Sequence, residues 1–291
     1  RQMCIRDRRQ VRNMPRLFEG TEITGQLTVE AARSWGMKPV PVAAGGGDNA
    51  AGAVGAGVVA DGSAMLSLGT SGVTFVTTDS HRPNIAGAVH AFCHAIPGTW
   101  HQMAVMLSAA SCLDWAARLL AYSSVAALIA DAEHVETDVI FLPYLTGERT
   151  PHNDTEAKGV FFGMTAGTEK AHLARAVLEG VALGLADGLI SLRAAGTDPH
   201  EISVIGGGAR SPVWGGILAS ALKTKLVYRD GATVGPAFGA ARLAQIATGA
   251  RIADVAKPPP EVSRMSPNTN FSKKQSRFRS LYAALKSEFR R

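Results

Sequence analysis

Cysteine and aromatic residues are scarce in this 291-residue chain. The cysteines are Cys4, Cys93 and Cys112, and aromatic residues make up 6% of the sequence. An odd cysteine count without a CxxC pair indicates neither a disulfide framework nor a zinc site, and it is typical of proteins from reducing compartments. We therefore expect a cytoplasmic location.

Long apolar runs are also missing. The most hydrophobic helix that the pattern predicts is interrupted by Arg175, Glu179 and Asp187. No segment therefore reaches the roughly 20 uncharged residues that span a bilayer. We expect no interaction with a membrane.

Several motifs of catalysis and nucleotide binding are absent. The chain contains no GxxxxGK[ST], no GxGxxG, no HExxH and no GxSxG. These absences argue against a P-loop enzyme, a dinucleotide enzyme, a zinc protease and a serine hydrolase. We predict no metal-binding side chains, and we expect structural or surface roles for the histidines His90, His94, His101, His134, His152 and His172.

The formal net charge of +6 does not indicate nucleic-acid binding, because the positive charge is confined to the chain ends. Residues 251–291 hold ten Lys or Arg and three acidic residues, and residues 1–16 hold six Arg and one acidic residue. The remainder is net negative. Basic ends without an aromatic stacking platform are typical of solvated tails, so we expect no nucleic-acid partner.

Glycine, by contrast, is abundant. The 31 glycines, with Ala-Gly runs in the first quarter, indicate close backbone packing. The pattern predicts a short helix over 28–35 capped by Thr28, a buried strand over 40–44, a central buried helix over about 169–192 and a basic helix near 276–290. These elements favour an α/β fold.

A glycine turn, Gly45-Gly-Gly-Asp48-Asn49, joins the strand over 40–44 to a helix of small residues. Asp48 has two interpretations. It is an N-cap that accepts hydrogen bonds from first-turn amides, or it is an exposed, ionised general base that a substrate hydroxyl approaches across the glycines.

Two further turns suit a phosphate or a nucleotide. Gly69-Thr70-Ser71-Gly72 joins two strand-like runs and predicts a β-hairpin, either an ordinary tight turn or one whose amides and hydroxyls hold phosphates. Gly206-Gly207-Gly208-Ala209 follows a predicted buried strand from Glu201 and precedes a helix over 212–222. Nucleotide pockets form at such strand ends.

The predicted central helix carries two carboxylates, Glu179 and Asp187. Buried carboxylates need partners. We expect neighbouring amides or Arg side chains to supply them, with contact between Asp187 and a nucleotide or its metal as the alternative. The roles of Glu148 and Arg149 stay open.

The order of these turns resembles the C-terminal half of the FGGY carbohydrate kinases. The most specific match is Gly159-Val-Phe-Phe-Gly163-Met164, followed after seven residues by His172-Leu-Ala-Arg-Ala-Val-Leu-Glu179. The stretches that begin at Gly45, Leu107 and Phe141 are similar to the family members that act on D-xylulose. Glycerol-specific members carry Gln at the position of Asn49.

The resemblance implies an α/β fold of the actin-like, ribonuclease-H-like ATPase type, a mixed sheet flanked by helices, as the second of two duplicated domains. It also implies ATP and Mg²⁺ as cofactors and phosphorylation of a ketopentose, D-xylulose to D-xylulose 5-phosphate. Asp48 would be the catalytic base, Asp48 and Asn49 would bind the sugar, and a homodimer is compatible with the family. The nucleotide would contact Gly69, Thr70, Ser71, Gly207, Gly208 and Ala209.

The same resemblance divides the chain. We expect a non-family leader over 1–13, a remnant of the inter-domain region over 14–44, the nucleotide-binding domain over 45–256 and a basic helix packed on it over 257–291. The family's first domain carries another phosphate loop and most sugar contacts. We therefore expect weak nucleotide binding, little turnover and self-association from these 291 residues alone.

Two other functions stay open from the sequence. One is an FGGY kinase for another sugar, such as gluconate, ribulose or fuculose. The other is a nucleotide-binding or interaction module of the actin-like superfamily without kinase activity, in which Asp48 would have no need to act as a base.

Overall fold

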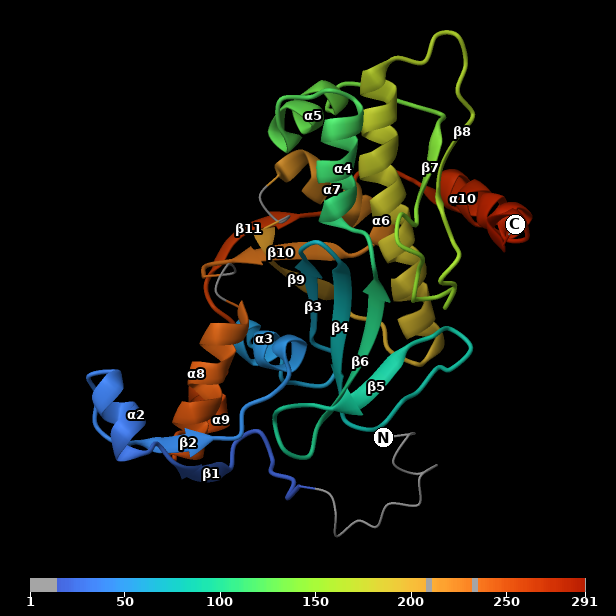
Figure 1. Cartoon of the computed structure of the whole chain (residues 1–291). Coiled ribbons are helices and arrows are strands. Elements are labelled where there is room, and N and C mark those ends of the chain that lie inside the picture. The colour runs from blue at the N-terminus through green and yellow to red at the C-terminus, as the bar shows by residue number, and fades with distance from the viewer. Residues whose placement is uncertain (1–14, 208–210, 232–234, 291) are drawn as a thin grey trace.

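A seven-stranded mixed sheet forms the centre of the computed structural model, which describes residues 15–207, 211–231 and 235–290 (Figure 1). The strand order is β11-β10-β9-β3-β4-β6-β5. Strands β10, β9 and β3 are parallel, and the other pairs are antiparallel. The strands are β3 (Ala64–Leu68), β4 (Gly72–Thr78), β5 (His90–Cys93), β6 (Trp100–Met106), β9 (Glu201–Ile205), β10 (Lys225–Arg229) and β11 (Glu261–Met265).

Helices cover both faces of this sheet, and each face has its own core. Side chains alternate between faces along a strand. On β3, Leu66 and Leu68 therefore pack with one group of helices, whereas Met65 packs with the other. The first group contains α4 (Ala110–Leu119), α5 (Val125–Ala132), α6 (Lys170–Ala194), α7 (Pro212–Leu222) and α10 (Ser272–Leu285). The second contains α3 (Asp48–Ala56) and α8 (Gly235–Ala247), with the short α9 (Ile252–Val255) beside α8.

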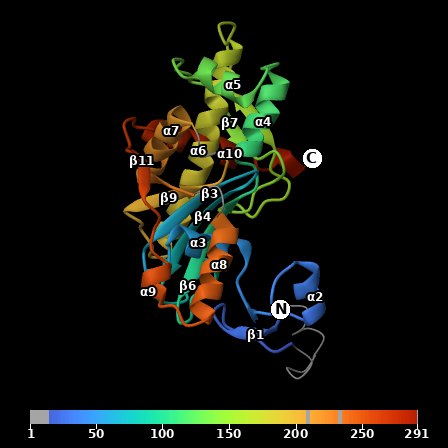
Figure 2. The ribbon, with the colours of Figure 1, turned by 90° about the vertical axis from the view of Figure 1, so that its left-hand side faces the viewer.

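Helices α3 and α8 pack backbone against backbone (Figure 2). A Cβ atom on Gly239 would lie 1.6 Å from the carbonyl oxygen of Ala51, and one on Gly55 would lie 2.4 Å from that of Gly235. Arg242 of α8 donates to the carbonyl oxygens of Val54 and Gly55 at 3.0 and 2.9 Å, near the end of α3. The close packing that the Ala-Gly runs predict is confirmed.

The central helix α6 is buried along most of its length, as predicted. Its Glu179 pairs with Arg175 at 2.6 Å and with Lys274 of α10. Its Asp187 pairs with Arg279 of α10 at 2.5 Å and accepts a hydrogen bond from Gln275 at 2.6 Å. The prediction that these carboxylates are satisfied structurally is confirmed, and the basic C-terminal helix supplies part of their partners.

The segment before α3 forms a small unit that stands off from the sheet (Figures 1 and 2). It contains β1 (Ile23–Gln26), α2 (Val29–Ser34) and β2 (Pro41–Ala43). Thr28 caps α2 by accepting a hydrogen bond from the Ala31 amide, as predicted. The predicted burial of the strand over 40–44 is wrong, because β2 pairs with β1 alone among the described strands and its side chains are largely exposed.

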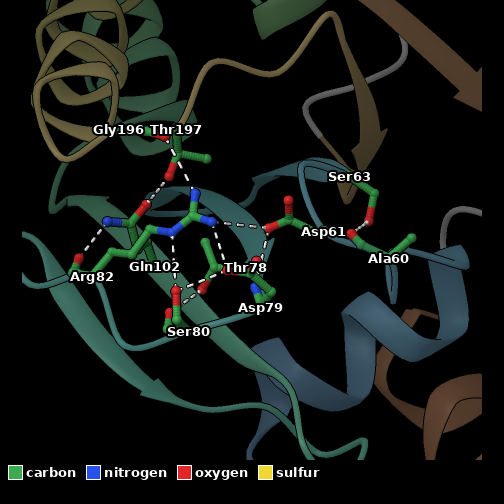
Figure 3. Close-up of polar contacts among 10 residues, drawn as sticks. All are labelled: Ala60, Asp61, Ser63, Thr78, Asp79, Ser80, Arg82, Gln102, Gly196 and Thr197. Carbon is green, nitrogen blue, oxygen red and sulfur yellow. Dashed lines mark hydrogen bonds and ion pairs between the residues drawn. The ribbon is translucent and has the colours of Figure 1, made fainter.

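Arg82 closes the base of the sheet, the end at which β3 begins and β4 stops (Figure 3). Its guanidinium lies 2.6 Å from Asp79 and 3.6 Å from Asp61, and it donates to the Gly196 carbonyl at 3.3 Å. Gln102 of β6 donates to the Arg82 carbonyl and accepts a hydrogen bond from Thr197. Three separate loops are tied together here.

A second two-stranded sheet, β7 (Ile140–Pro143) with β8 (Gly159–Phe162), lies against α6. The final turn of 3-10 helix is Glu288–Arg290. Among the described residues, no helix is both long and apolar enough to cross a membrane.

Candidate active site

Three turns meet at the end of the sheet opposite Arg82. Strands β3 and β9 run parallel with Ser67 beside Ile205, so both strands finish at the same edge. There β3 leads into the turn Gly69–Ser71, and β9 leads into Gly206 and Gly207. Helix α3 begins beside them, because Asp48 and Gly206 line the same small cavity.

Asp48 is the first residue of α3 and is exposed. The cap position that this interpretation gave Asp48 is wrong, because Gly47 is the N-cap, although Asp48 does accept a hydrogen bond from a first-turn amide, that of Asn49. The Asp48 Oδ1 atom accepts from the Asn49 amide at 2.8 Å and from Asn49 Nδ2 at 3.2 Å. Within the described residues, no hydrogen bond to Oδ2 is found. One carboxylate oxygen is therefore anchored and the other is open to a ligand.

The predicted hairpin is confirmed: β3 and β4 pair antiparallel from Ala64–Val76 to Leu68–Gly72. Its tip is held by the first turn of α4. The carbonyl oxygens of Gly69 and Thr70 accept from the amides of Ala110 and Ala109 at 3.0 and 2.9 Å. Ser111 Oγ also donates to the Thr70 carbonyl, at 2.9 Å. The carbonyl dipoles are thus turned into α4, and the outer side of the turn can receive an anion.

The glycine turn after β9 is confirmed as a strand-to-helix connection. Gly206 has φ +95°, and a Cβ atom there would lie 2.5 Å from the Leu68 carbonyl oxygen, so glycine is required. Helix α7 follows, with Pro212 in its first turn and Ser211 accepting from the Trp214 amide. The predicted contacts at Gly208 and Ala209 lie outside the described residues.

A cavity of about 620 Å³ opens between these turns and helices α4 and α5, a volume in the range of nucleotide and drug-sized sites. Gly69 and Thr70 form one end and Gly207 another. Its lining also contains Ala110, Leu113, Asp114, Val125, Ala126, Ile129, Ala130, Glu133, Ser211 and Trp214. Small and apolar side chains suit a base and ribose, while the hairpin tip offers backbone groups and hydroxyls to phosphates.

A second cavity, of about 110 Å³, contains Asp48, Asn49 and Ser67. Gly206 lines this cavity and Gly207 lines the larger one. The Asp48 carboxylate and the hairpin therefore lie on either side of one glycine turn. A group transferred from a ligand in the larger cavity to one beside Asp48 would cross at this turn.

Sequence reasoning missed the wall of the larger cavity that α5 supplies. Val125 and Ile129 are four residues apart and so share one face of that helix, and both line the cavity. That apolar pair on a short helix was the available signal, although it equally fits a core contact. Asp114 of α4 was missed too. It also lines the cavity.

Glu148 holds the segment that leads into α4. Its buried Oε1 accepts from the amides of Leu107 and Arg149 at 3.0 and 2.7 Å. Burial raises the pKa of Glu148 to about 7, although these amides and Arg149 oppose the shift. Leu107 lies two residues before Ala109, so Glu148 fixes the segment that enters the helix holding the hairpin.

The buried histidines have structural surroundings, as predicted. Burial lowers the pKa of His94, His101 and His152 to about 4. His94 bonds to the Val58 carbonyl and His101 stacks on Phe75 with ring centroids 4.4 Å apart. Across the described residues, no group of three His, Cys, Asp or Glu side chains could hold a metal ion.

The sequence matches two family descriptions. Residues 64–248 match the C-terminal domain of the FGGY family of carbohydrate kinases, and residues 5–55 match its N-terminal domain. The chain belongs to the FGGY family of carbohydrate kinases. The N-terminal match begins at residue 5, within the segment 1–13 that we expected to lie outside the family.

Individual relatives of this FGGY chain are similar over most of its length. The xylulose kinase of Escherichia coli strain K12 is 59% identical over 237 residues, which are 80% of this chain and 49% of that protein. Two solved structures, a xyloylose kinase from Brucella ovis and the xylulose kinase from Rhodospirillum rubrum, superpose with TM-scores of 0.88 and 0.81 at 42% and 29% identity. They cover 94% and 96% of this chain, which in turn covers 58% of each of them.

These likenesses confirm the predicted fold, a mixed sheet flanked by helices of the actin-like ATPase type. The chain spans about half the length of the curated relatives it matches.

Proposed function

We propose that this chain is the part of an ATP-dependent ketopentose kinase that holds the nucleotide and the general base, in an enzyme that converts D-xylulose to D-xylulose 5-phosphate. One observation carries the proposal. An exposed carboxylate with one anchored oxygen, Asp48, adjoins a nucleotide-sized cavity across the turn Gly206-Gly207. The similarity to xylulose kinases supports the choice of sugar.

In the proposed reaction, Asp48 takes the proton from the C5 hydroxyl of the sugar. The hydroxyl oxygen forms a bond to the γ-phosphorus of ATP, the bond from that phosphorus to the β–γ bridging oxygen breaks, and ADP leaves. Asn49 orients Asp48 through the bonds to Oδ1 and also contacts the sugar. General bases of this kind contribute about 10²- to 10⁴-fold to the rate.

The nucleotide would lie with its β- and γ-phosphates at the hairpin tip. The Gly69 amide donates to the Ser71 carbonyl at 3.0 Å inside the turn, so we assign the phosphate contacts chiefly to Thr70 and Ser71. Gly207, and with it Gly208 and Ala209, would border the adenosine. Mg²⁺ neutralises phosphate charge when bound, and we propose that phosphate oxygens and water supply most of its ligands.

A chimera tests the proposal. The matching half of the Escherichia coli xylulose kinase is replaced by this chain, and ADP release is measured with D-xylulose, ribulose, fuculose and gluconate. Asp48→Asn is compared with Asp254→Asn, an isosteric change of an exposed carboxylate on α9. We expect turnover selective for D-xylulose, which Asp48→Asn lowers at least about 100-fold while ATP binding and the control stay unchanged.

Three other results of the chimera assay would change the proposal. Selective turnover with another sugar would replace D-xylulose as the substrate. ATP binding without phosphorylation of any sugar would favour the nucleotide-binding module. Full activity of Asp48→Asn would remove Asp48 as the base.

The cytoplasmic location and the homodimer are proposals as well. Cell fractionation tests the first, and light scattering of the chimera tests the second. The domain division at residues 13, 44 and 256 is tested by limited proteolysis. Because β11 joins the central sheet beyond residue 256 and Ala256 is buried, we expect the exposed segment near residue 44 to be cut before residue 256.

A further inference from the structure

A second groove lies against α6, away from the candidate active site. It has a volume of about 440 Å³ and shares no lining residue with the cavities beside Asp48 and Thr70. Helix α6, the end of α7 and the first turns of α10 form its walls, where α10 runs next to α6 (Figure 1). We call it the α6–α10 groove.

The α6–α10 groove is positively charged. Arg193, Lys223 and Arg279 line it, and none of the described residues in its lining is acidic. Arg193 is neutralised by Asp198 at 2.6 Å, and Arg279 by the buried Asp187. Lys223 differs from both, because within the described part of the chain its ammonium bonds to the Ser272 hydroxyl at 3.0 Å and makes no ion pair with a carboxylate. An exposed cation therefore faces the groove without an opposite charge.

Hydroxyl groups form a row beside this cation. Ser272, Ser276 and Ser280 lie four residues apart on α10, so they share one face of the helix, and all three line the groove. Gln275, also in the lining, donates its amide to the Leu183 carbonyl and to Asp187, while its buried Oε1 has no hydrogen-bond partner among the residues that the structure describes. That acceptor gains a bond if a donor enters.

The remaining wall is apolar. Ile190 is 40% exposed although it belongs to α6, which is buried along most of its length, and Phe271 packs at the start of α10. A ligand with a short carbon skeleton would cover Ile190. The groove thus combines an unneutralised cation, a row of hydroxyls and a small apolar surface within a volume that suits a small molecule.

We propose that the α6–α10 groove binds a small phosphate monoester of a sugar or polyol. The phosphate lies against Lys223 and Ser272, the ligand hydroxyls bond to Ser276 and Ser280, and the carbon chain covers Ile190. This proposal is independent of the reaction proposed at Asp48.

Calorimetric titration of the 291-residue chain tests it, with saturating ADP present to occupy the candidate nucleotide cavity. The probes are D-ribose 5-phosphate, inorganic phosphate and D-ribose. We expect the phosphate ester to bind most tightly, inorganic phosphate more weakly and D-ribose not at all, because a hydrogen bond to an ionised group is the strongest contact available.

Three variants separate the groove from general charge effects. Lys223→Gln and Ser276→Asp alter the groove, and Lys273→Gln alters an exposed residue of α10 outside it. Each lowers the net charge by one. Gln at position 223 meets the same left-handed backbone, φ 54°, as Lys. We expect the two groove variants to weaken binding of the ester at least about tenfold and the control to change it less than twofold.

Three results would overturn the proposal. The first is that Lys273→Gln weakens binding of the ester as much as Lys223→Gln does. The second is that D-ribose binds as tightly as its phosphate ester. The third is that the ester does not bind at millimolar concentration. Ser276→Asp keeps the test decisive if Lys223→Gln fails to fold.

Discussion

The two ends of the central sheet are built in opposite ways from the same strands. At the site end, β3 and β9 stop at glycine turns, and the surroundings are backbone groups and cavities. At the base, long polar side chains around Arg82 join three loops. Close approach of a ligand to backbone amides requires small residues, whereas joining distant loops requires long side chains with several donors. The first arrangement leaves room for chemistry, and the second supplies rigidity.

The sharpest test of the site end is Gly206→Ala. Alanine would meet a left-handed backbone and the Leu68 carbonyl at 2.5 Å, so we expect a loss of about 2–4 kcal/mol in the free energy of unfolding. Gly207→Ala is the matched control, because no described residue lies within 4 Å of a Cβ atom placed at that position. Denaturant titration measures both. Equal losses would mean that the tight packing of this turn is not what makes glycine necessary.

The two ends also predict opposite effects of pH on stability. At the site end, the folded-state pKa of Glu148 is raised to about 7 from 4.5. As pH rises from about 4.5 to 7, the unfolded chain ionises first, and stability falls. The free energy of unfolding of Glu148→Gln, relative to that of the wild type, should therefore be about 1–2 kcal/mol higher at pH 8 than at pH 5. Chemical denaturation at both pH values measures this gain, and the exposed Glu156→Gln should not reproduce it.

At the base, His101 makes stability fall when the pH is lowered, opposite to the effect of Glu148. Burial, with His94 and His90 nearby, lowers its pKa from 6.5 to about 4. As pH falls from about 6.5 to 4, the unfolded chain takes up the proton first, and stability is lost. The free energy of unfolding of His101→Phe, relative to that of the wild type, should therefore be about 1 kcal/mol higher at pH 5 than at pH 7.5. The control is the exposed His134→Phe. An unchanged slope in His101→Phe would contradict the assignment.

The smallest expected effect is that of Arg82→Met. Several partly exposed bonds at the base would be lost, and we expect the melting temperature to fall by roughly 3 °C. Nucleotide affinity should not change, because the guanidinium lies at the opposite end from the turns. The exposed Arg251→Met serves as control in differential scanning calorimetry. A loss of nucleotide affinity would show that the two ends are coupled.

Local chemistry made much of the fold predictable. Thr28 predicts a helix start, Gly69–Gly72 predicts a hairpin, and the residues from Glu201 to Leu222 predict a strand, a turn and a helix. Each of these predictions depends only on neighbours in sequence. The exposure of β2 was not predictable. Val40 to Ala44 is apolar enough for a core strand, but only the pairing with β1 decides that it lies outside the main sheet.

The sequence by itself determined the family, the turns and the identity of Asp48 as the residue to test, since each depends on a short contiguous pattern. Only the tertiary structure decided that the Asp48 and hairpin cavities adjoin across Gly206-Gly207, that α5 walls the larger one, and that α10 neutralises the carboxylates of α6. The reason is physical. These contacts join residues tens to hundreds of positions apart, and their geometry depends on how helices pack on a twisted sheet, which no local pattern records.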